Sequence, residues 1–179
     1  MAFRGRRSES KDSDLSLTPE QWDERARGLI LARLTRGPRS KRQLAQLLEQ
    51  RGVPEEVAVP LLDRFEEVGL IDDEAFARAF ANDRRSTRGL AKSALKRELS
   101  NLGVAESHIE EAIGDIQPED DLELATALVR KRWPSVAKLE ADARYRRLSS
   151  FLARRGFSGS AISAAIRAID AEAREAAEA

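Results

Sequence analysis

Few side chains in this sequence could carry acid–base or metal chemistry. The chain has one histidine and no cysteine, which excludes disulfides, thiolate metal sites, a cysteine nucleophile and any zinc site built from several histidines. His108 stands among glutamates at the start of a predicted helix, where a solvent-exposed histidine is the favoured interpretation. Asp72 and Asp73 precede another helical pattern, and we expect them to cap free backbone amides rather than to bind a metal.

The sequence also lacks the motifs of known catalytic sites. It contains no glycine-rich phosphate loop followed by lysine and serine or threonine, and no nucleophile elbow. No acidic pair stands at a suitable spacing from a general base. We therefore predict that the protein is not an enzyme and uses no cofactor or metal.

Charge is distributed unevenly, although 31 lysines and arginines balance 31 acidic residues. Segments 25–42 and 84–97 contain basic residues and no acid, and segment 130–155 contains nine basic residues and two acidic ones. The predicted contact residues of the last two segments are Arg84, Arg85, Arg88, Lys92, Lys96, Arg97, Arg144, Arg147 and Arg154. At helical spacing, three residues of segment 84–97 (Arg88, Lys92, Lys96) would form one ridge, and the last three of the set a second ridge. Such ridges suit a polyphosphate backbone or an acidic protein groove, whereas solvated helix faces are the plainer alternative.

The elements that must position these residues follow an internal repeat. Two leucines four residues apart, then a glycine and an apolar residue, occur three times at intervals of about 50 residues. The repeated residues are Leu44, Leu48, Gly52 and Val53; Leu95, Leu99, Gly103 and Val104; and Leu148, Leu152, Gly156 and Phe157. The leucines predict a helix, the glycine a left-handed residue that ends it, and the apolar residues that follow a second helix.

A third amphipathic stretch precedes each pair of helices, starting at Trp22, Phe76 and Leu122. The predicted fold is therefore all-α, with three tandem three-helix modules in an elongated, curved array. The predicted modules span residues 21–70, 71–117 and 118–170, between a disordered tail at 1–20 and a fraying helical extension at 171–179. Pro60 conflicts with the last helix of the first module, which should kink there or begin later than Pro54 indicates.

Composition and apolar runs indicate whether the chain is soluble or crosses a membrane. With 35% charged and 41% apolar residues, a helix-rich soluble chain is expected. No apolar run approaches the roughly 20 residues of a membrane span, and the first twenty residues lack the apolar core of a signal peptide. We expect a cytoplasmic protein without membrane contact, and a monomer as the default state.

Segment 40–71 also fits a helix-turn-helix, the motif of many DNA-binding transcription regulators. Its second helix, however, would carry Asp63, Glu66 and Glu67 with only Arg64, and carboxylates suit a DNA-reading helix poorly. A winged form would need strands after Leu70, where a further helix is predicted instead. A transcription regulator and a repeat protein with a long binding surface are thus the two alternatives that sequence mechanics leave open.

Three segments resemble the RecX regulatory proteins, the bacterial modulators of the RecA recombinase. They are GLIDDEAFARAF at 69–80, RRSTRG-x-x-K-x-x-LKREL at 84–99 and FLARRGFS at 151–158. The resemblance covers roughly residues 22–170. Where many relatives carry Lys-Gly-Ile at the second glycine turn, this chain has Leu102-Gly103-Val104, and its two tails lie outside the family pattern.

The resemblance implies three tandem three-helix modules and a regulatory function. Proteins of this family bind the active RecA filament on single-stranded DNA and lie in its helical groove. They restrain ATP hydrolysis, strand exchange and co-protease activity, and bind DNA weakly themselves. A partner of this kind would make the nine predicted contact residues, which form the two basic ridges and their surroundings, contacts to RecA or to DNA.

Overall fold

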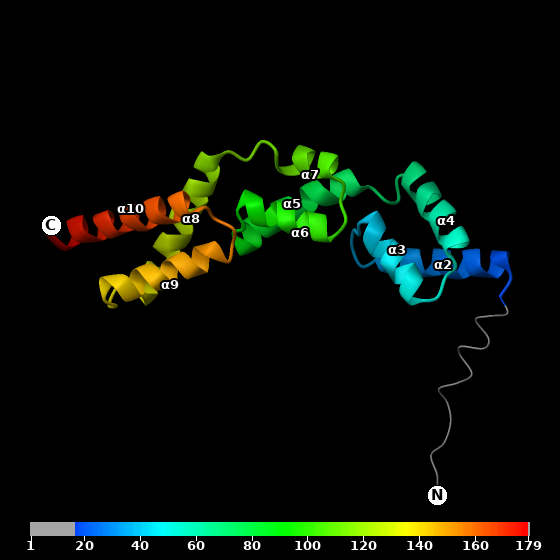
Figure 1. Ribbon diagram of the computed structural model, residues 1–179, viewed down its shortest axis with the longest axis horizontal. Coiled ribbons are helices and arrows are strands. Elements are labelled where there is room, and N and C mark those ends of the chain that lie inside the picture. The colour runs from blue at the N-terminus through cyan, green and yellow to red at the C-terminus, as the bar shows by residue number, and fades with distance from the viewer. Residues whose placement is uncertain (1–16, 179) are drawn as a thin grey trace, which may run out of the picture. The chain divides into compact units, whose positions relative to one another are not determined.

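A computed structural model describes residues 17–178 of the chain, and all regular elements within that range are helices (Figure 1). They are α2 (Pro19–Leu34), α3 (Lys41–Gln50), α4 (Glu55–Glu67), α5 (Asp73–Arg88), α6 (Lys92–Asn101), α7 (Glu106–Ile113), α8 (Pro118–Arg132), the short 3-10 helix η2 (Trp133–Ser135), α9 (Ala141–Ala153) and α10 (Gly159–Glu178). The all-α prediction is confirmed. The predicted tail lies outside the described residues up to position 16, but α2 starts at Pro19, ahead of the predicted Trp22, because Thr18 and Gln21 form a capping box.

The chain divides into two compact units. One comprises the residues up to Phe76 together with Leu102–Val104, and the other comprises Ala77–Asn101 and the chain from Ala105 onward. No helix between residues 17 and 178 is long and apolar enough to span a bilayer.

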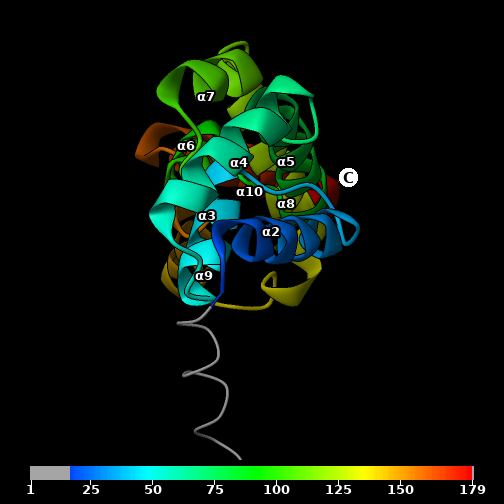
Figure 2. The ribbon, with the colours of Figure 1, turned by 90° about the vertical axis from the view of Figure 1, so that its right-hand side faces the viewer.

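The first unit is a three-helix core. Helices α2, α3 and α4 lie side by side (Figures 1 and 2). Their buried residues include Ala26 and Ile30 from α2, Leu44 and Leu48 from α3, and Phe65 from α4. The apolar positions recur every three or four residues on each helix, so the faces predicted from the sequence meet in one core.

Pro60 does not delay the start of α4. The helix begins directly after Pro54 and continues through Pro60 to Glu67, so of the two predicted alternatives, a kink or a later start, the later start is wrong. A proline at this position removes one backbone bond. Burial of Leu61, Leu62 and Phe65 on the following turns stabilises the helix sufficiently to offset that loss.

The second unit contains a core between α8, α9 and α10. Helix α8 packs along α10, and Val129, Leu148, Leu152 and Ile166 are buried among these helices. Ala91, from the connection between α5 and α6, joins the same cluster of buried residues. The end of α5 and the start of α6 are therefore attached to the last three helices.

The repeated glycines adopt the backbone conformation that the pattern predicts. Gly52, Gly103 and Gly156 have φ of 72°, 78° and 86°, a region that favours glycine because it has no Cβ. The amide after the turn bonds back into the helix at both ends of the chain: Val53 N–H donates to the Leu48 carbonyl at 3.0 Å, and Phe157 N–H to the Leu152 carbonyl at 3.4 Å. The predicted helix ends are confirmed.

Two of these glycine turns are held by the start of another helix. The Ser40 hydroxyl donates to the Leu102 carbonyl at 2.6 Å, and the Ser93 hydroxyl donates to the Gly156 carbonyl at 2.6 Å. At the Gly156 turn, the Ala91 N–H also donates to the Arg155 carbonyl at 3.0 Å. Carbonyls that a helix end leaves without intrahelical partners are satisfied in this way.

Aspartates at the starts of α5 and α8 accept hydrogen bonds from backbone amides at the starts of three helices. Asp72 Oδ1 accepts a hydrogen bond from the Ala75 N–H at 2.8 Å, so it caps α5 as predicted. Asp73 instead accepts from the Lys41 N–H, the first residue of α3, at 2.8 Å. Asp121 of α8 does the same for the Lys92 N–H of α6 at 3.2 Å. A carboxylate from a distant helix thus satisfies an amide that α3 or α6 cannot pair by itself.

Replacement of Leu99 by alanine should lower the free energy of unfolding by about 3 kcal/mol. Leu99 is fully buried at the end of α6, so truncation leaves a cavity lined by rigid neighbours. Denaturant titration measures the loss, and Arg97→Ala on an exposed face of the same helix is the matched control. Equal, small effects of the two substitutions would show that the face assigned to Leu99 is not a core face.

Candidate functional site

The structure divides the nine predicted contact residues into two groups. Four are half-buried and bonded within the protein: Arg84, Arg85, Lys92 and Arg144. Five are exposed: Arg88, Lys96, Arg97, Arg147 and Arg154. All nine belong to the second unit, but the side chains of the first group serve the fold, whereas those of the exposed group are accessible from solvent.

The predicted ridge of Arg88, Lys92 and Lys96 on one helix is wrong. Arg88 is the last residue of α5, Gly89 follows with φ of 63°, and Lys92 begins α6. Lys92 Nζ donates to the Gly114 and Ile116 carbonyls at 2.7 and 3.2 Å. A lysine ammonium at the C-terminus of α7 stabilises carbonyls that have no helical partner, so Lys92 is a structural residue.

Arg85 and Asp121 form an ion pair that ties α5 to α8. Arg85 Nη1 lies 2.6 Å from Asp121 Oδ1, and the side chains are only 22% and 19% exposed. Asp121 also receives the Lys92 N–H. One carboxylate therefore connects the end of α5, the start of α6 and the start of α8.

Asp121→Asn should cost about 2 kcal/mol of folding stability, because the arginine loses its charged partner in a site with little solvent. Thermal or denaturant unfolding would measure this loss. Glu119→Gln, an exposed acid in the same turn of α8, should change stability by only a few tenths of a kcal/mol. A loss for Asp121→Asn no larger than that of the control would show that the ion pair does not hold the helices together.

Arg144 is likewise part of the fold. Its guanidinium donates to Asp170 Oδ1 at 2.7 Å and to the Leu139 carbonyl at 2.9 Å. It also lies 5.0 Å from the centre of the Trp133 ring. The predicted second ridge is thereby reduced to Arg147 and Arg154, which lie on similar sides of α9 and its end.

Three of the remaining cations have acidic neighbours within the unit. Arg84 stacks over the Phe80 ring at 4.7 Å and lies 3.6 Å from Glu98, which is also 3.9 Å from Arg88. Lys96 pairs with Glu106 at 2.5 Å, and this hydrogen bond and its charge raise the pKa of Lys96. The acid-free segment of the sequence is therefore partly neutralised in space by carboxylates from outside it.

Arg97, Arg147 and Arg154 are the predicted contact residues with uncompensated charge. All three are exposed, and within residues 17–178 their side chains make no hydrogen bond or ion pair. Because these side chains support nothing in the fold, they are the predicted residues best suited to bind an acidic partner.

His108 is less exposed than expected. Its side chain is 37% exposed, and Nδ1 lies 3.8 Å from Glu111 on the same helix. The distance is long for a hydrogen bond. The position at the edge of α7 is that of a surface histidine in partial contact with its own helix.

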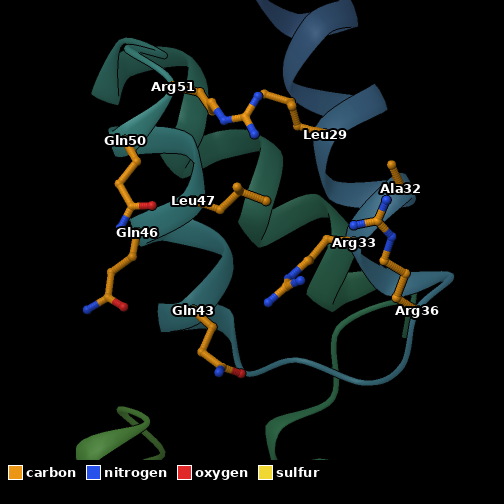
Figure 3. Close-up of a pocket in the computed structure, with 9 residues that line it drawn as sticks. All are labelled: Leu29, Ala32, Arg33, Arg36, Gln43, Gln46, Leu47, Gln50 and Arg51. Atoms are coloured by element: carbon orange, nitrogen blue, oxygen red, sulfur yellow. The ribbon is translucent and has the colours of Figure 1, made fainter.

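The first unit has a basic groove, and the residues that line it were not among the predicted contact residues. Figure 3 shows Arg33 reaching from α2 toward α3, with Leu47 on the facing helix. The cavity between the helices has a volume of about 380 Å³ and is also lined by Arg36, Arg51 and three glutamines. None of these arginines has an ion pair in the described part of the chain. The acid-free segment 25–42 was the signal for two of them, whereas Arg51 joins them through the packing of α3 on α2.

Comparison with protein families matches two segments of the chain. Residues 72–113 match a model described as the second three-helix domain of RecX, and residues 119–166 match the third three-helix domain of RecX. The chain is 42% identical over 158 residues to the Regulatory protein RecX of Streptomyces coelicolor, covering 88% of this chain and 84% of that protein. It is 42% identical over 143 residues to the Thermobifida fusca Regulatory protein RecX, covering 80% and 77%.

Solved structures support the same fold. A crystal structure of RecX from Lactobacillus salivarius aligns with a TM-score of 0.72 at 17% identity, covering 84% of this chain and 98% of that one. A crystal structure titled regulatory protein RecX aligns with a TM-score of 0.72 at 23% identity, covering 91% and 80%. At these identities the likeness concerns the fold alone.

Proposed function

Because this chain belongs to the RecX family of regulatory proteins, we propose that it binds the RecA filament on single-stranded DNA and inhibits its activities. These activities are ATP hydrolysis, strand exchange and co-protease function, so the protein modulates recombination and DNA repair. Family membership is the observation that carries the proposal. The proposed partner acts on chromosomal DNA, so we place the protein in the cytoplasm, and a monomer is the default state for an array of helical modules.

The proposed contacts to RecA are the exposed cations among the nine predicted contact residues. Arg97, Arg147 and Arg154 are free of internal partners among the described residues, and Arg88 is 59% exposed. Separate weak contacts from one molecule to neighbouring subunits of a filament raise the overall affinity without any single tight site. A set of exposed, spaced cations is suited to that form of binding.

The direct test is inhibition of RecA. The protein should co-sediment with RecA filaments assembled on single-stranded DNA and slow their ATP hydrolysis in a dose-dependent way. A control with the same DNA but no RecA separates filament binding from binding to DNA. Unchanged ATP hydrolysis at a saturating concentration of the protein would refute the proposal.

A helix-turn-helix transcription regulator is the second candidate, since α3 and α4 have that order and spacing. The side chains of α4 disfavour it. Lys41 Nζ binds Asp63 at 2.6 Å and Glu66 at 2.8 Å, and these hydrogen bonds raise the pKa of Lys41. The helix that would read DNA thus presents carboxylates, which already hold the nearest lysine of α3.

Selection from a random duplex library separates the two candidates. A transcription regulator binds its operator about 10³-fold or more above random DNA. We expect no duplex sequence to reach that ratio with this protein. A discrete footprint on one selected sequence would favour the transcription regulator.

A further inference from the structure

A basic cavity lies in the second unit where the end of α5 meets α8 and α9. Its volume is about 390 Å³. The residues that line it are Arg85, Ser86, Thr87, Arg88, Gly89, Leu124, Leu128, Lys131, Arg132, Ser135, Phe151 and Arg155. Five of them are cations and none is an acid. Lys131, Arg132 and Arg155 were not among the predicted contact residues, because the sequence does not show that they face the end of α5.

Two of the guanidinium groups are held in place by one aromatic ring. Arg155 lies 3.8 Å and Arg132 4.6 Å from the centre of the Phe151 ring. Arg155 Nε also donates to the Arg88 carbonyl at 3.0 Å, and its Nη1 donates to the Phe151 carbonyl at 3.2 Å. Stacking and hydrogen bonds of this kind order a guanidinium before a ligand arrives, which reduces the entropy lost on binding.

The positive charge of the cavity is largely uncompensated. Arg85 has Asp121 as its partner and Arg88 lies 3.9 Å from Glu98, but Lys131, Arg132 and Arg155 form no ion pair within the part of the chain that the structure describes. Burial, followed by the charges of Arg132 and Arg154, lowers the pKa of Arg155. Cations gathered without carboxylates repel each other, and an external anion would relieve that repulsion.

The hydroxyl groups of the cavity are already engaged. Ser86 and Thr87 donate to the Asp83 carbonyl at 3.1 and 2.6 Å, and Ser135 donates to the Arg132 carbonyl at 2.7 Å. The cations therefore supply the donors for a ligand. Leu124 and Leu128 add an apolar wall beside them.

We propose that this cavity binds phosphodiester groups of single-stranded nucleic acid. Arginine and lysine are the main donors to nucleic-acid phosphates, and the apolar wall suits the sugar that lies next to each phosphate. A flexible single strand can turn a phosphate into a hollow, whereas a stiff duplex presents its phosphates on a convex surface. Consecutive phosphates also supply several charges to Arg88, Lys131 and Arg132 at once, which an isolated carboxylate does not.

The inference goes beyond the proposed function, because it assigns a phosphate site to one cavity of the second unit and its test needs no RecA. The probe is a labelled oligothymidylate, and its affinity is measured by fluorescence anisotropy as salt is varied. The test protein is the double variant Lys131→Gln/Arg132→Gln. The matched control is Arg146→Gln/Arg167→Gln, which removes two exposed charges of the same unit that do not line the cavity.

Each phosphate contact to a single strand changes the slope of log affinity against log salt by about 0.7. The double variant should therefore have a slope shallower by about 1.4, and an affinity about 25-fold lower at 0.1 M salt. The control should bind like the wild type. Circular dichroism and thermal unfolding check that loss of the Arg132 stacking leaves the fold intact. The single variant Lys131→Gln, whose side chain has no internal partner among the described residues, should shift the slope by about 0.7.

Three results would overturn the inference. The double variant could bind oligothymidylate with the same affinity and slope as the control. A duplex of the same length could bind as tightly as the single strand. Polyglutamate could displace the labelled oligothymidylate at lower concentrations than unlabelled oligothymidylate does, which would assign the cavity to an acidic protein. Loss of DNA binding with RecA inhibition intact would support the inference separately from the proposed function.

Discussion

A protein with Arg97, Arg147 and Arg154 all replaced by glutamate should bind the RecA filament about 100-fold more weakly than the wild type. Each reversed contact should cost roughly 1 kcal/mol of binding free energy. If all three residues contact the partner, the total cost lowers the affinity by about two orders of magnitude. The fold should survive, because these exposed side chains have no internal partner in the described range. Inhibition of ATP hydrolysis should fall in parallel.

A triple variant at Arg88, Lys92 and Lys96, the ridge that helical spacing predicts, would be a poorer test. Reversing Lys92 would remove the donor from the C-terminus of α7, and reversing Lys96 would set it against Glu106. Loss of inhibition in that variant would not distinguish a damaged fold from a lost contact. Arg97, Arg147 and Arg154 avoid this ambiguity.

The control for the triple variant must match its change in net charge. Glutamate at Arg64, Arg146 and Arg167 reverses three other exposed arginines and should leave inhibition nearly unchanged. Inhibition by the wild type should also weaken as salt rises, because salt screens exposed charge pairs. If the test variant inhibits RecA at wild-type concentrations, the contact surface lies elsewhere, and the groove of Arg33, Arg36 and Arg51 becomes the next candidate.

Gly156→Ala should lower the free energy of unfolding by about 4 kcal/mol. The left-handed backbone at φ of 86° costs an alanine about 1 to 2 kcal/mol. A Cβ at this position would also come within 2.7 Å of the Ala94 Cβ and 2.8 Å of the Ala94 backbone nitrogen. Relief of that overlap requires the glycine turn to move away from the start of α6, which adds roughly 1 to 3 kcal/mol.

Gly52→Ala is the matched control for this substitution. Gly52 has the same role at the end of α3 and a similar φ of 72°, but a Cβ there would meet nothing within 4 Å. Its cost should be the backbone strain alone, about 1 to 2 kcal/mol. Denaturant unfolding of both variants gives the difference. Equal losses would mean that the close contact with α6 contributes nothing to stability.

The sequence by itself determined the helical repeat and its glycine turns. These features depend on interactions between residues a few positions apart. Leu44 and Leu48 share a helix face, and Gly52 ends that helix because its backbone can turn left-handed. The motif blocks around 69–80, 84–99 and 151–158 likewise indicated the family, which depends on residue order alone.

Only the tertiary structure decided which basic residues remain free. Segment 84–97 contains no acid, yet Asp121 and Glu98 approach Arg85 and Arg84 from other parts of the chain. The break at Gly89 separates Arg88 from Lys92, which helical spacing had placed on one ridge.

Packing also brought together residues that the sequence holds far apart. Arg88, Lys131, Arg132 and Arg155 meet around one cavity because α5, α8 and α9 converge there. Coulomb and hydrogen-bond energies depend on distances in space. The charge of a segment can therefore be read from the sequence, whereas its compensation depends on helices that pack from elsewhere in the chain.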